Sequence, residues 1–252
     1  MVFAVPADAY DRFMGRYSVQ LSAALADLAR VRPGQRVLDV GCGPGALTAE
    51  LVGRVGAASV AAVDPSESFV AACRERHPGV DVHAAPAEAL PFGDGEFDAA
   101  LAQLVVHFMR DPVAGLREMR RVTRPGGTVA ACVWDNAEGM GMLRPFWESA
   151  TELDPQARDE SDLAGARPGH LAELFRQAGL DDVEDTALEA SVEYASFEEW
   201  WGLFLLGVGP SGAYAASLEP ERLVELRERC RTRLPDGRFV LSARAWAARG
   251  TA

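Results

Sequence analysis

The sequence predicts an α/β fold in which a mainly parallel sheet is covered by helices on both faces. Short apolar segments, typical of buried strands, alternate with helical segments of roughly 10 to 15 residues. This spacing is typical of right-handed strand–helix–strand units, whose two strands are parallel. With 252 residues, 48% of them apolar, the chain can bury a substantial core. We expect a single domain over residues 1–252.

The first half of the chain contains the regular part of this pattern. Its expected strands are residues 36–40, 59–63, 80–85, 98–104 and 128–134. A helix over 46–52 follows the first strand. Ser66 is placed to cap the next helix, and Asp111 with Pro112 opens another. Each strand therefore leads into a helix or a turn that can return the chain to the same sheet.

The pattern changes after residue 168. Residues 171–178 form an expected helix, and residues 183–194 and 239–246 are two expected strands. Between these strands, residues 197–237 read as two helices, one of them opening at Pro220. We interpret 136–168 and 197–237 as insertions that cap the substrate side of the sheet, and 1–30 as N-terminal helices or a lid.

The charge balance limits the classes of partner. The net charge is −12, which disfavours phosphate backbones and anionic membrane surfaces, so we expect neither nucleic acid nor membrane as a partner. The closely spaced Arg117, Arg120 and Arg121 are interpreted as a solvated helix face. The chain contains no lysine, which excludes any mechanism that requires one.

Cysteine usage and the N-terminal sequence bear on location. Cys42, Cys73, Cys132 and Cys230 lack metal-ligand spacing and are expected to be reduced thiols. No basic region followed by an apolar run begins the chain, and no apolar stretch is long enough for a bilayer. We therefore expect a cytoplasmic protein, with the oligomeric state left open.

A glycine-rich turn after the first strand identifies the candidate ligand site. The segment Val-Leu-Asp-Val-Gly-Cys-Gly-Pro-Gly spans residues 37–45 and joins that strand to the first helix. Glycines allow a sharp turn and close approach of a ligand, and the helix N-terminus favours an anionic group. Asp64 ends the second strand, where a carboxylate can accept hydrogen bonds from both hydroxyls of a ribose.

A nicotinamide cofactor is the alternative reading of this turn. Gly41, Gly43 and Ala46 satisfy a loose Gly-x-Gly-x-x-Ala pattern. Two features oppose it. Asp39 stands where dinucleotide-binding folds usually continue with apolar residues, and the lysine needed by short-chain reductases is missing.

Several motifs together resemble a known family. Residues 37–45 resemble motif I of the class I S-adenosylmethionine (SAM)-dependent methyltransferases. Residues 90–98, Leu-Pro-Phe-Gly-Asp-Gly-Glu-Phe-Asp, resemble a signature of its ubiquinone/menaquinone-methylase-like (type 11) group. Asp64 and the turn at 124–127 also match. The resemblance covers about residues 10–135 and implies a Rossmann-like sheet of seven strands, the last antiparallel, with SAM along the carboxyl ends of strands one to four.

The resemblance also implies where SAM would bind. Gly41 and Gly43 would border its methionine part, and Asp64 would bind the ribose. Pro86 departs from the family, which often has an Asp there for the adenine amino group, so Glu88 is the candidate replacement. The complete expected set is Tyr10, Arg16, Asp39, Gly41, Cys42, Gly43, Asp64, Pro65, Ser66, Phe69, Pro86, Ala87, Glu88, Ala102, Gln103 and Leu104.

The catalytic groups are harder to identify, because methyl transfer from a sulfonium depends mainly on alignment. His107 follows strand four within one turn and is the candidate base or orienting donor, with a structural histidine as the alternative. Asp135 and Asn136 stand where metal-dependent catechol methyltransferases have ligands, but Ala102-Gln103 replaces a further acid, so no metal is expected.

The sequence leaves alternatives open for the N-terminal segment and for the activity. Arg16 could face the SAM carboxylate from a lid, or its segment could be a helix packed permanently on the sheet. The whole protein is expected to methylate an O, N or C atom of a small molecule, in an apolar chamber built by aromatic residues of the insertions. The alternative is a SAM-binding protein of this fold that catalyses a rearrangement or only binds.

Overall fold

The computed structural model describes residues 7–252, which contain a seven-stranded sheet in the order β3-β2-β1-β4-β5-β7-β6. The strands β1 to β5 are parallel, and β7 runs antiparallel to both of its neighbours, β5 and β6. The strands are β1 (Val37–Val40), β2 (Val60–Asp64), β3 (Asp81–Ala84), β4 (Phe97–Gln103), β5 (Thr123–Trp134), β6 (Asp181–Tyr194) and β7 (Phe239–Thr251). The predicted fold class, with its antiparallel last strand, is confirmed.

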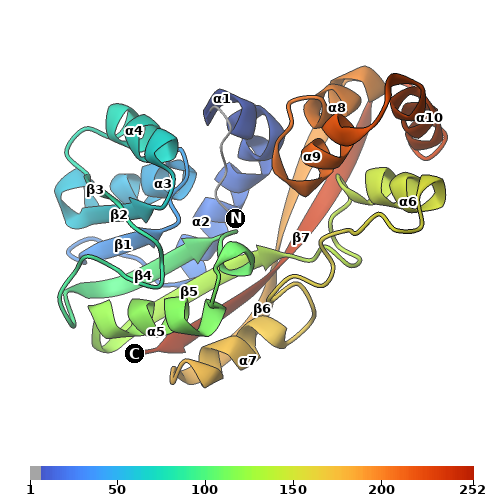
Figure 1. Ribbon diagram of the computed structural model, residues 1–252. Helices are drawn as coiled ribbons and strands as arrows, with labels where there is room; N and C mark the ends of the chain where they lie inside the picture. The colour runs from blue at the N-terminus through green and yellow to red at the C-terminus, as the bar shows by residue number, and fades with distance from the viewer. Residues whose placement is uncertain (1–6) are drawn as a thin grey trace.

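Helices cover both faces of the sheet (Figure 1). One face carries α2 (Arg16–Leu28), α3 (Ala46–Val55) and α4 (Glu67–Arg76), and the other carries α5 (Pro112–Val122) and α7 (His170–Gln177). Strand β1 is buried along its whole length because it packs against helices on both sides. Its Val37 belongs to the core under α2 and α3, whereas Leu38 and Val40 belong to the core under α5.

The order of the strands fixes the place of the ligand site. From β1 the chain proceeds outward to β2 and β3, and then crosses to β4 on the other side of β1. At such a topological switch point, the loops after neighbouring strands diverge and leave a crevice. The glycine turn after β1, Asp64 at the end of β2 and Gln103 at the end of β4 therefore meet at one edge of the sheet.

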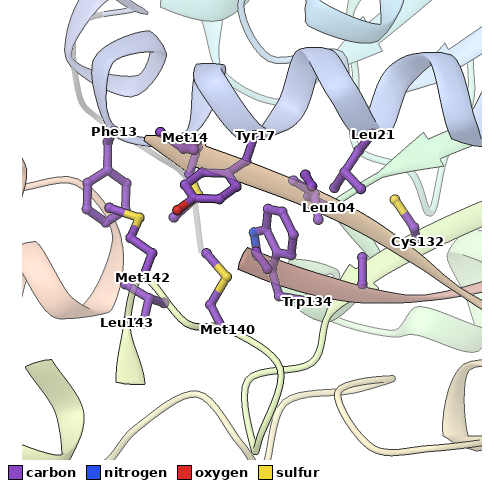
Figure 2. Packing of buried hydrophobic residues seen from close by; sticks show 14 of the residues in the cluster. Phe13, Met14, Tyr17, Leu21, Leu104, Cys132, Trp134, Met140, Met142 and Leu143 are labelled. Atoms are coloured by element: carbon purple, nitrogen blue, oxygen red, sulfur yellow. The ribbon is translucent and has the colours of Figure 1, made fainter. Parts of the chain in front are cut away.

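The N-terminal segment packs into the core from Phe13 onward. A short α1 (Ala7–Tyr10) passes through one π-helical stretch, η1 (Asp11–Gly15), into α2. Phe13, Met14 and Tyr17 are buried, and Figure 2 shows Tyr17 beside Trp134, with ring centroids 6.1 Å apart. The structure thus supports the packed-helix reading for this part. Of the N-terminal segment expected as lid or helices, residues 1–6 lie outside the described residues.

The two insertions meet at one end of the sheet, beside β6 and β7 (Figure 1). The first contains α6 (Arg144–Leu153), and the second contains α8 (Phe197–Phe204), α9 (Gly209–Ser217) and α10 (Pro220–Arg231). The predicted helix that opens at Pro220 is confirmed as α10, but two helices precede it where one was expected. Gly207, before α9, and Gly209, its first residue, have φ of 69° and 66°. A continuous helix does not contain such positive φ values, so α8 and α9 are separate helices.

The insertions share an aromatic core with the sheet. The rings of Phe146 and Phe204 stack at 4.4 Å, and the indole of Trp200 donates to the carbonyl of Met142 over 3.0 Å. Ion pairs also join the two insertions at the surface, for example between Arg233 and Glu148 at 3.4 Å. No helix among the described residues is both long enough and apolar enough to cross a membrane.

The Leu-Pro-Phe-Gly-Asp signature has a structural role through Arg121. This guanidinium donates to Asp94 Oδ1 over 2.8 Å and to the Phe92 carbonyl over 2.9 Å, while its Nε pairs with Glu118 over 2.7 Å. Arg121 therefore anchors the loop before β4 to α5. The interpretation of Arg121 as part of a solvated face was wrong.

Candidate active site

The turn after β1 is tied to the neighbouring strand by its backbone. The amides of Gly41 and Cys42 both donate to the carbonyl of Val63, over 2.8 and 2.9 Å. Gly41 has a φ of 73°, and a Cβ there would lie 2.4 Å from a Val105 methyl. Only glycine fits this position, because any side chain would meet both backbone strain and a clash.

Asp64 connects the same turn to the start of α4. Its Oδ2 accepts from the Gly43 amide over 2.9 Å, and its Oδ1 accepts from the Ser66 amide over 2.8 Å. Burial raises the pKa of this carboxyl, and the two amide donors counteract that rise. Each oxygen retains a second acceptor site, so the carboxylate is held rigidly and can still bind two ligand hydroxyls.

These residues lie on the wall of a cavity of about 640 Å³, called here the first cavity. Its volume is in the range of ligand pockets for molecules of nucleoside size. Expected residues that line it are Tyr10, Gly41, Gly43, Asp64, Pro65, Phe69, Pro86, Ala87, Glu88, Gln103 and Leu104. Lining residues that the sequence reasoning missed are Glu67, Ala84, Ala85, Val105, Phe108, Met109 and Arg110. Most of the missed residues directly adjoin predicted ones.

Some expected residues lie beneath the wall rather than on it. Cys42, Ser66 and Ala102 are buried and do not line the first cavity. Asp39 is fully buried too, and its Oδ2 accepts from the Thr48 hydroxyl over 2.6 Å. Burial raises the pKa of Asp39 to about 7. Asp39 thus supports the turn from below by holding it to α3.

Arg16 does not reach the first cavity. Its Nη1 pairs with Glu199 at 2.7 Å, its Nη2 donates to the carbonyl of Glu193, and its guanidinium lies over the Tyr194 ring. These partners belong to β6 and α8, so the side chain fastens α2 to the second insertion. The structure therefore does not place Arg16 where we expected it, beside a cofactor carboxylate in the first cavity.

The end of β4 carries an unusual backbone conformation at the cavity. Leu104 has a φ of 60°, which costs a non-glycine residue about 1–3 kcal/mol, and its amide donates to the Cys132 carbonyl over 2.8 Å. Its neighbour Gln103 donates from Nε2 to the Ser18 carbonyl over 3.1 Å. The Oε1 of Gln103 is buried without a partner among the described residues.

Part of the lining of the first cavity suits a flat ring. Phe69 lines the cavity, with Tyr10 edge-on at 5.6 Å, and Ala87 lines it from the loop after β3. Glu88 also lines the first cavity, but its Oε1 already accepts from the amides of Arg110 and Asp111, over 2.7 and 3.2 Å. Glu88 therefore holds the loop after β4, which leaves its other oxygen for an amino group.

A second cavity, of about 40 Å³, adjoins the first. It is little larger than the space of a water molecule in this conformation. Tyr10, Leu104 and Phe108 line both cavities and are called here the dividing wall. The other residues of the second cavity are Phe13, Met14, His107, Trp134, Leu143, Glu160, Val208, Gly209, Pro210 and Ser211.

His107 lies in the second cavity, within η3 (Val106–Phe108). Its ring packs on Phe108 at 4.0 Å, and its Nδ1 is buried without a partner among the described residues. Burial lowers the pKa of His107 to about 3, so the ring is neutral at physiological pH. The structure thus brings His107 to the second cavity, in a form that orients a ligand better than it accepts a proton.

Glu160 shares the second cavity with His107 and was not predicted. It lies in the irregular segment between α6 and α7, where no motif or periodicity marks it. The residue is only 7% exposed, and burial raises the pKa of its carboxyl to about 7. A burial pattern that depends on contacts with distant segments gives no signal in the local sequence.

Asp135, one of the two residues at the place of metal ligands in catechol methyltransferases, has an arginine as its partner. Asp135 is buried and pairs with Arg244, whose Nε lies 2.8 Å from its Oδ2. Over residues 7–252, no group of three or more His, Cys, Asp or Glu side chains is placed to hold a metal ion.

Comparison with known proteins places this arrangement in a family. Residues 38–131 match the family described as "Methyltransferase domain". The demethylmenaquinone methyltransferase of Mycobacterium sp. (strain KMS) is 43% identical over 175 residues, which cover 68% of this chain and 71% of that enzyme. The malonyl-[acyl-carrier protein] O-methyltransferase of Halorhodospira halophila is 31% identical over 252 residues, covering 88% and 77% of the two chains.

A solved structure has the same fold. Phospholethanolamine N-methyltransferase 2 of Haemonchus contortus, in complex with phosphomonomethylethanolamine and S-adenosylhomocysteine, superposes with a TM-score of 0.58. Its sequence is 18% identical, and the match covers 98% of this chain and 57% of that one.

Other relatives are matched over less of their length. The chain spans 42% of the demethylmenaquinone methyltransferase of Beutenbergia cavernae and 35% of a transposon-encoded protein of Streptomyces fradiae. The named acceptors differ among relatives, so the similarity identifies the reaction class and not the acceptor. Two relatives that are matched over 71% and 77% of their length carry methyltransferase names, and on this ground the chain belongs to the SAM-dependent methyltransferases.

Proposed function

We propose that the protein transfers the methyl group of SAM, bound in the first cavity, to an atom of a small organic molecule in the second. The observation that carries this proposal is the dividing wall, because Tyr10, Leu104 and Phe108 face both cavities. An in-line displacement needs donor and acceptor to meet at such a junction, away from water. The insertions that flank it would form the cap over the acceptor.

The residues present fit SAM well. Asp64 would bind the ribose hydroxyls, and the backbone at Gly41 and Gly43 would approach the methionine part. The buried Oε1 of Gln103 would accept from the methionine ammonium group, since it has no partner among the described residues. With Arg16 engaged elsewhere, the N-terminus of α3 is the element suited to the carboxylate. SAM supplies the methyl group as an electrophile when it is bound.

The proposal extends to partners and location. The acceptor is a small molecule rather than a nucleic acid or a membrane lipid surface, which the net charge of −12 disfavours. A cytoplasmic location is supported by four cysteines that are all buried and unpaired. His107 is proposed as a residue that contacts and orients the acceptor, since it is neutral and faces the second cavity.

Calorimetry tests the cofactor directly. We expect S-adenosylhomocysteine and SAM to bind in the micromolar range that is usual for enzyme ligands, and NADH not to bind in that range. Binding of NADH alone would refute the proposal. With the cofactor bound, release of S-adenosylhomocysteine is then measured over a panel of hydroxyl, amine and carbon acceptors. Turnover of a ligand without that release would instead support the rearrangement alternative.

A further inference from the structure

Glu160 combines burial with an unused acceptor atom at the second cavity. It is 7% exposed, and its Oε2 is buried without a hydrogen-bond partner among the described residues. The main chain at this point is tied to Asn136, whose Nδ2 donates to the Glu160 carbonyl over 3.4 Å. Burying a carboxyl group without a hydrogen-bond partner costs free energy. A bound ligand or a proton would reduce that cost.

We propose that Glu160 is the general base of the acceptor site, and that the acceptor is a neutral, mainly apolar molecule whose reacting atom is a hydroxyl oxygen. This inference rests on the proposed function, because it assumes that the acceptor occupies the second cavity. It assigns a catalytic role to a residue outside every motif of the sequence.

The surroundings of Glu160 suit proton transfer near neutral pH. Burial is the largest cause that raises its pKa to about 7, and the charge of the neighbouring Asp159 raises it further. The indole of Trp147 lowers the pKa, and it is a larger influence than Asp159, although its Nε1 lies outside normal hydrogen-bond geometry. The remaining titratable groups on the cavity wall, His107 and Tyr10, are both neutral at this pH. A base with such a pKa matches the working pH.

His107 is the weaker candidate for the same role. Its pKa of about 3 means that a proton on the ring would be strongly disfavoured. Its buried Nδ1 can still accept or donate one hydrogen bond, depending on the tautomer. Both residues line one cavity, and each has a buried polar atom without a partner among the described residues. His107 is suited to orientation and Glu160 to proton removal.

The rest of the lining defines the class of acceptor. Phe13, Phe108, Trp134, Leu143 and Val208 make the wall mainly aromatic and aliphatic. The lining includes no arginine, and the chain has no lysine. An acceptor with a carboxylate or phosphate inside the cavity would meet Glu160 without a compensating cation, so a neutral molecule is favoured. Because the cavity holds only about 40 Å³, part of its lining must move to admit the acceptor.

The acceptor oxygen forms a bond to the methyl carbon while the carbon–sulfur bond breaks, and that bonding pair stays on sulfur. The hydroxyl proton passes to the carboxylate of Glu160, which becomes a neutral carboxyl and later releases the proton to solvent. No oxidant or reductant is required.

Binding of simple probes tests the assignment without turnover. Protein saturated with S-adenosylhomocysteine is titrated with phenol and with anisole, its methyl ether, at pH values on both sides of the Glu160 pKa. We expect phenol to bind at least about tenfold more tightly, because anisole cannot donate a hydrogen bond. The preference should increase as the pH rises through about 7, since the ionised carboxylate is the stronger acceptor.

Two variants make the test specific. Glu160→Gln keeps the shape of the side chain but cannot ionise, so the preference for phenol should fall and lose its pH dependence. Glu148→Gln, an exposed acid on α6 in the same insertion, should behave like the wild type. Absent phenol binding, or the same pH-dependent preference in Glu160→Gln, overturns the assignment of Glu160. Failure of S-adenosylhomocysteine to bind refutes the proposed function instead.

Discussion

Replacing Asp64 with alanine should weaken the binding of S-adenosylhomocysteine by at least about 100-fold. The carboxylate would make two charge-assisted hydrogen bonds to the ribose, each worth about 1.5–3 kcal/mol, and about 1.4 kcal/mol corresponds to a factor of ten. The change also removes the acceptor for the Gly43 and Ser66 amides, which loosens the wall of the first cavity. Calorimetric titration of the variant measures the effect.

The control is Asp81→Ala on the neighbouring strand β3. Asp81 is exposed and pairs with His83 at 2.8 Å, and it does not line the first cavity. This variant should bind S-adenosylhomocysteine as the wild type does. Both variants should retain the far-ultraviolet circular dichroism of the folded protein. Unchanged affinity in Asp64→Ala would show that the ribose is held elsewhere.

Replacing Tyr17 with alanine should lower the free energy of unfolding by about 3–5 kcal/mol, as expected for a large buried aromatic residue. Tyr17 is fully buried between α2 and the sheet, and its hydroxyl donates to the Leu241 carbonyl over 3.2 Å. Urea denaturation measures the loss. Tyr17→Phe keeps the ring and should cost only about 1 kcal/mol.

The variant Tyr10→Ala, at the end of α1, is compared with Tyr17→Ala in α2. Tyr10 is only partly buried and lines both cavities, so its loss should weaken S-adenosylhomocysteine binding several-fold and change the free energy of unfolding by less than about 1 kcal/mol. The pair separates the two readings of the N-terminal segment. If Tyr17→Ala left the stability intact and only weakened ligand binding, the segment would act as a lid beyond Tyr10.

The regular part of the fold was predictable because its determinants are local. The strand over 36–40, the glycine turn and Asp64 lie within one strand–helix–strand unit, where apolar runs and turn residues specify the backbone. Their three-dimensional relation then follows from the handedness of parallel connections. For the same reason the residues that follow each strand were predicted to meet, and most of them line one cavity.

The errors concern side chains whose partners lie far away in the sequence. Arg16 pairs with Glu199, 183 residues later, and no local pattern distinguishes that partner from a cofactor carboxylate. In the sequence, Arg121 is one of three closely spaced arginines and looks like part of a solvated helix face. In the structure it donates to Phe92 and Asp94, in the loop before β4. Glu160 became a candidate only once folding had buried it beside His107.

The dividing wall makes the two ligands thermodynamically dependent on each other. Tyr10, Leu104 and Phe108 cannot adjust to a molecule on one side without altering the space on the other. By linkage, any factor by which the cofactor changes the affinity for the acceptor is the factor by which the acceptor changes the affinity for the cofactor. With SAM in the first cavity as proposed, SAM and its product would differ at this boundary by one methyl group and the positive charge of the sulfonium. An acceptor in the second cavity should therefore change the affinity for SAM and the affinity for its product by different factors. Binding of the acceptor and exchange of product for SAM are then coupled.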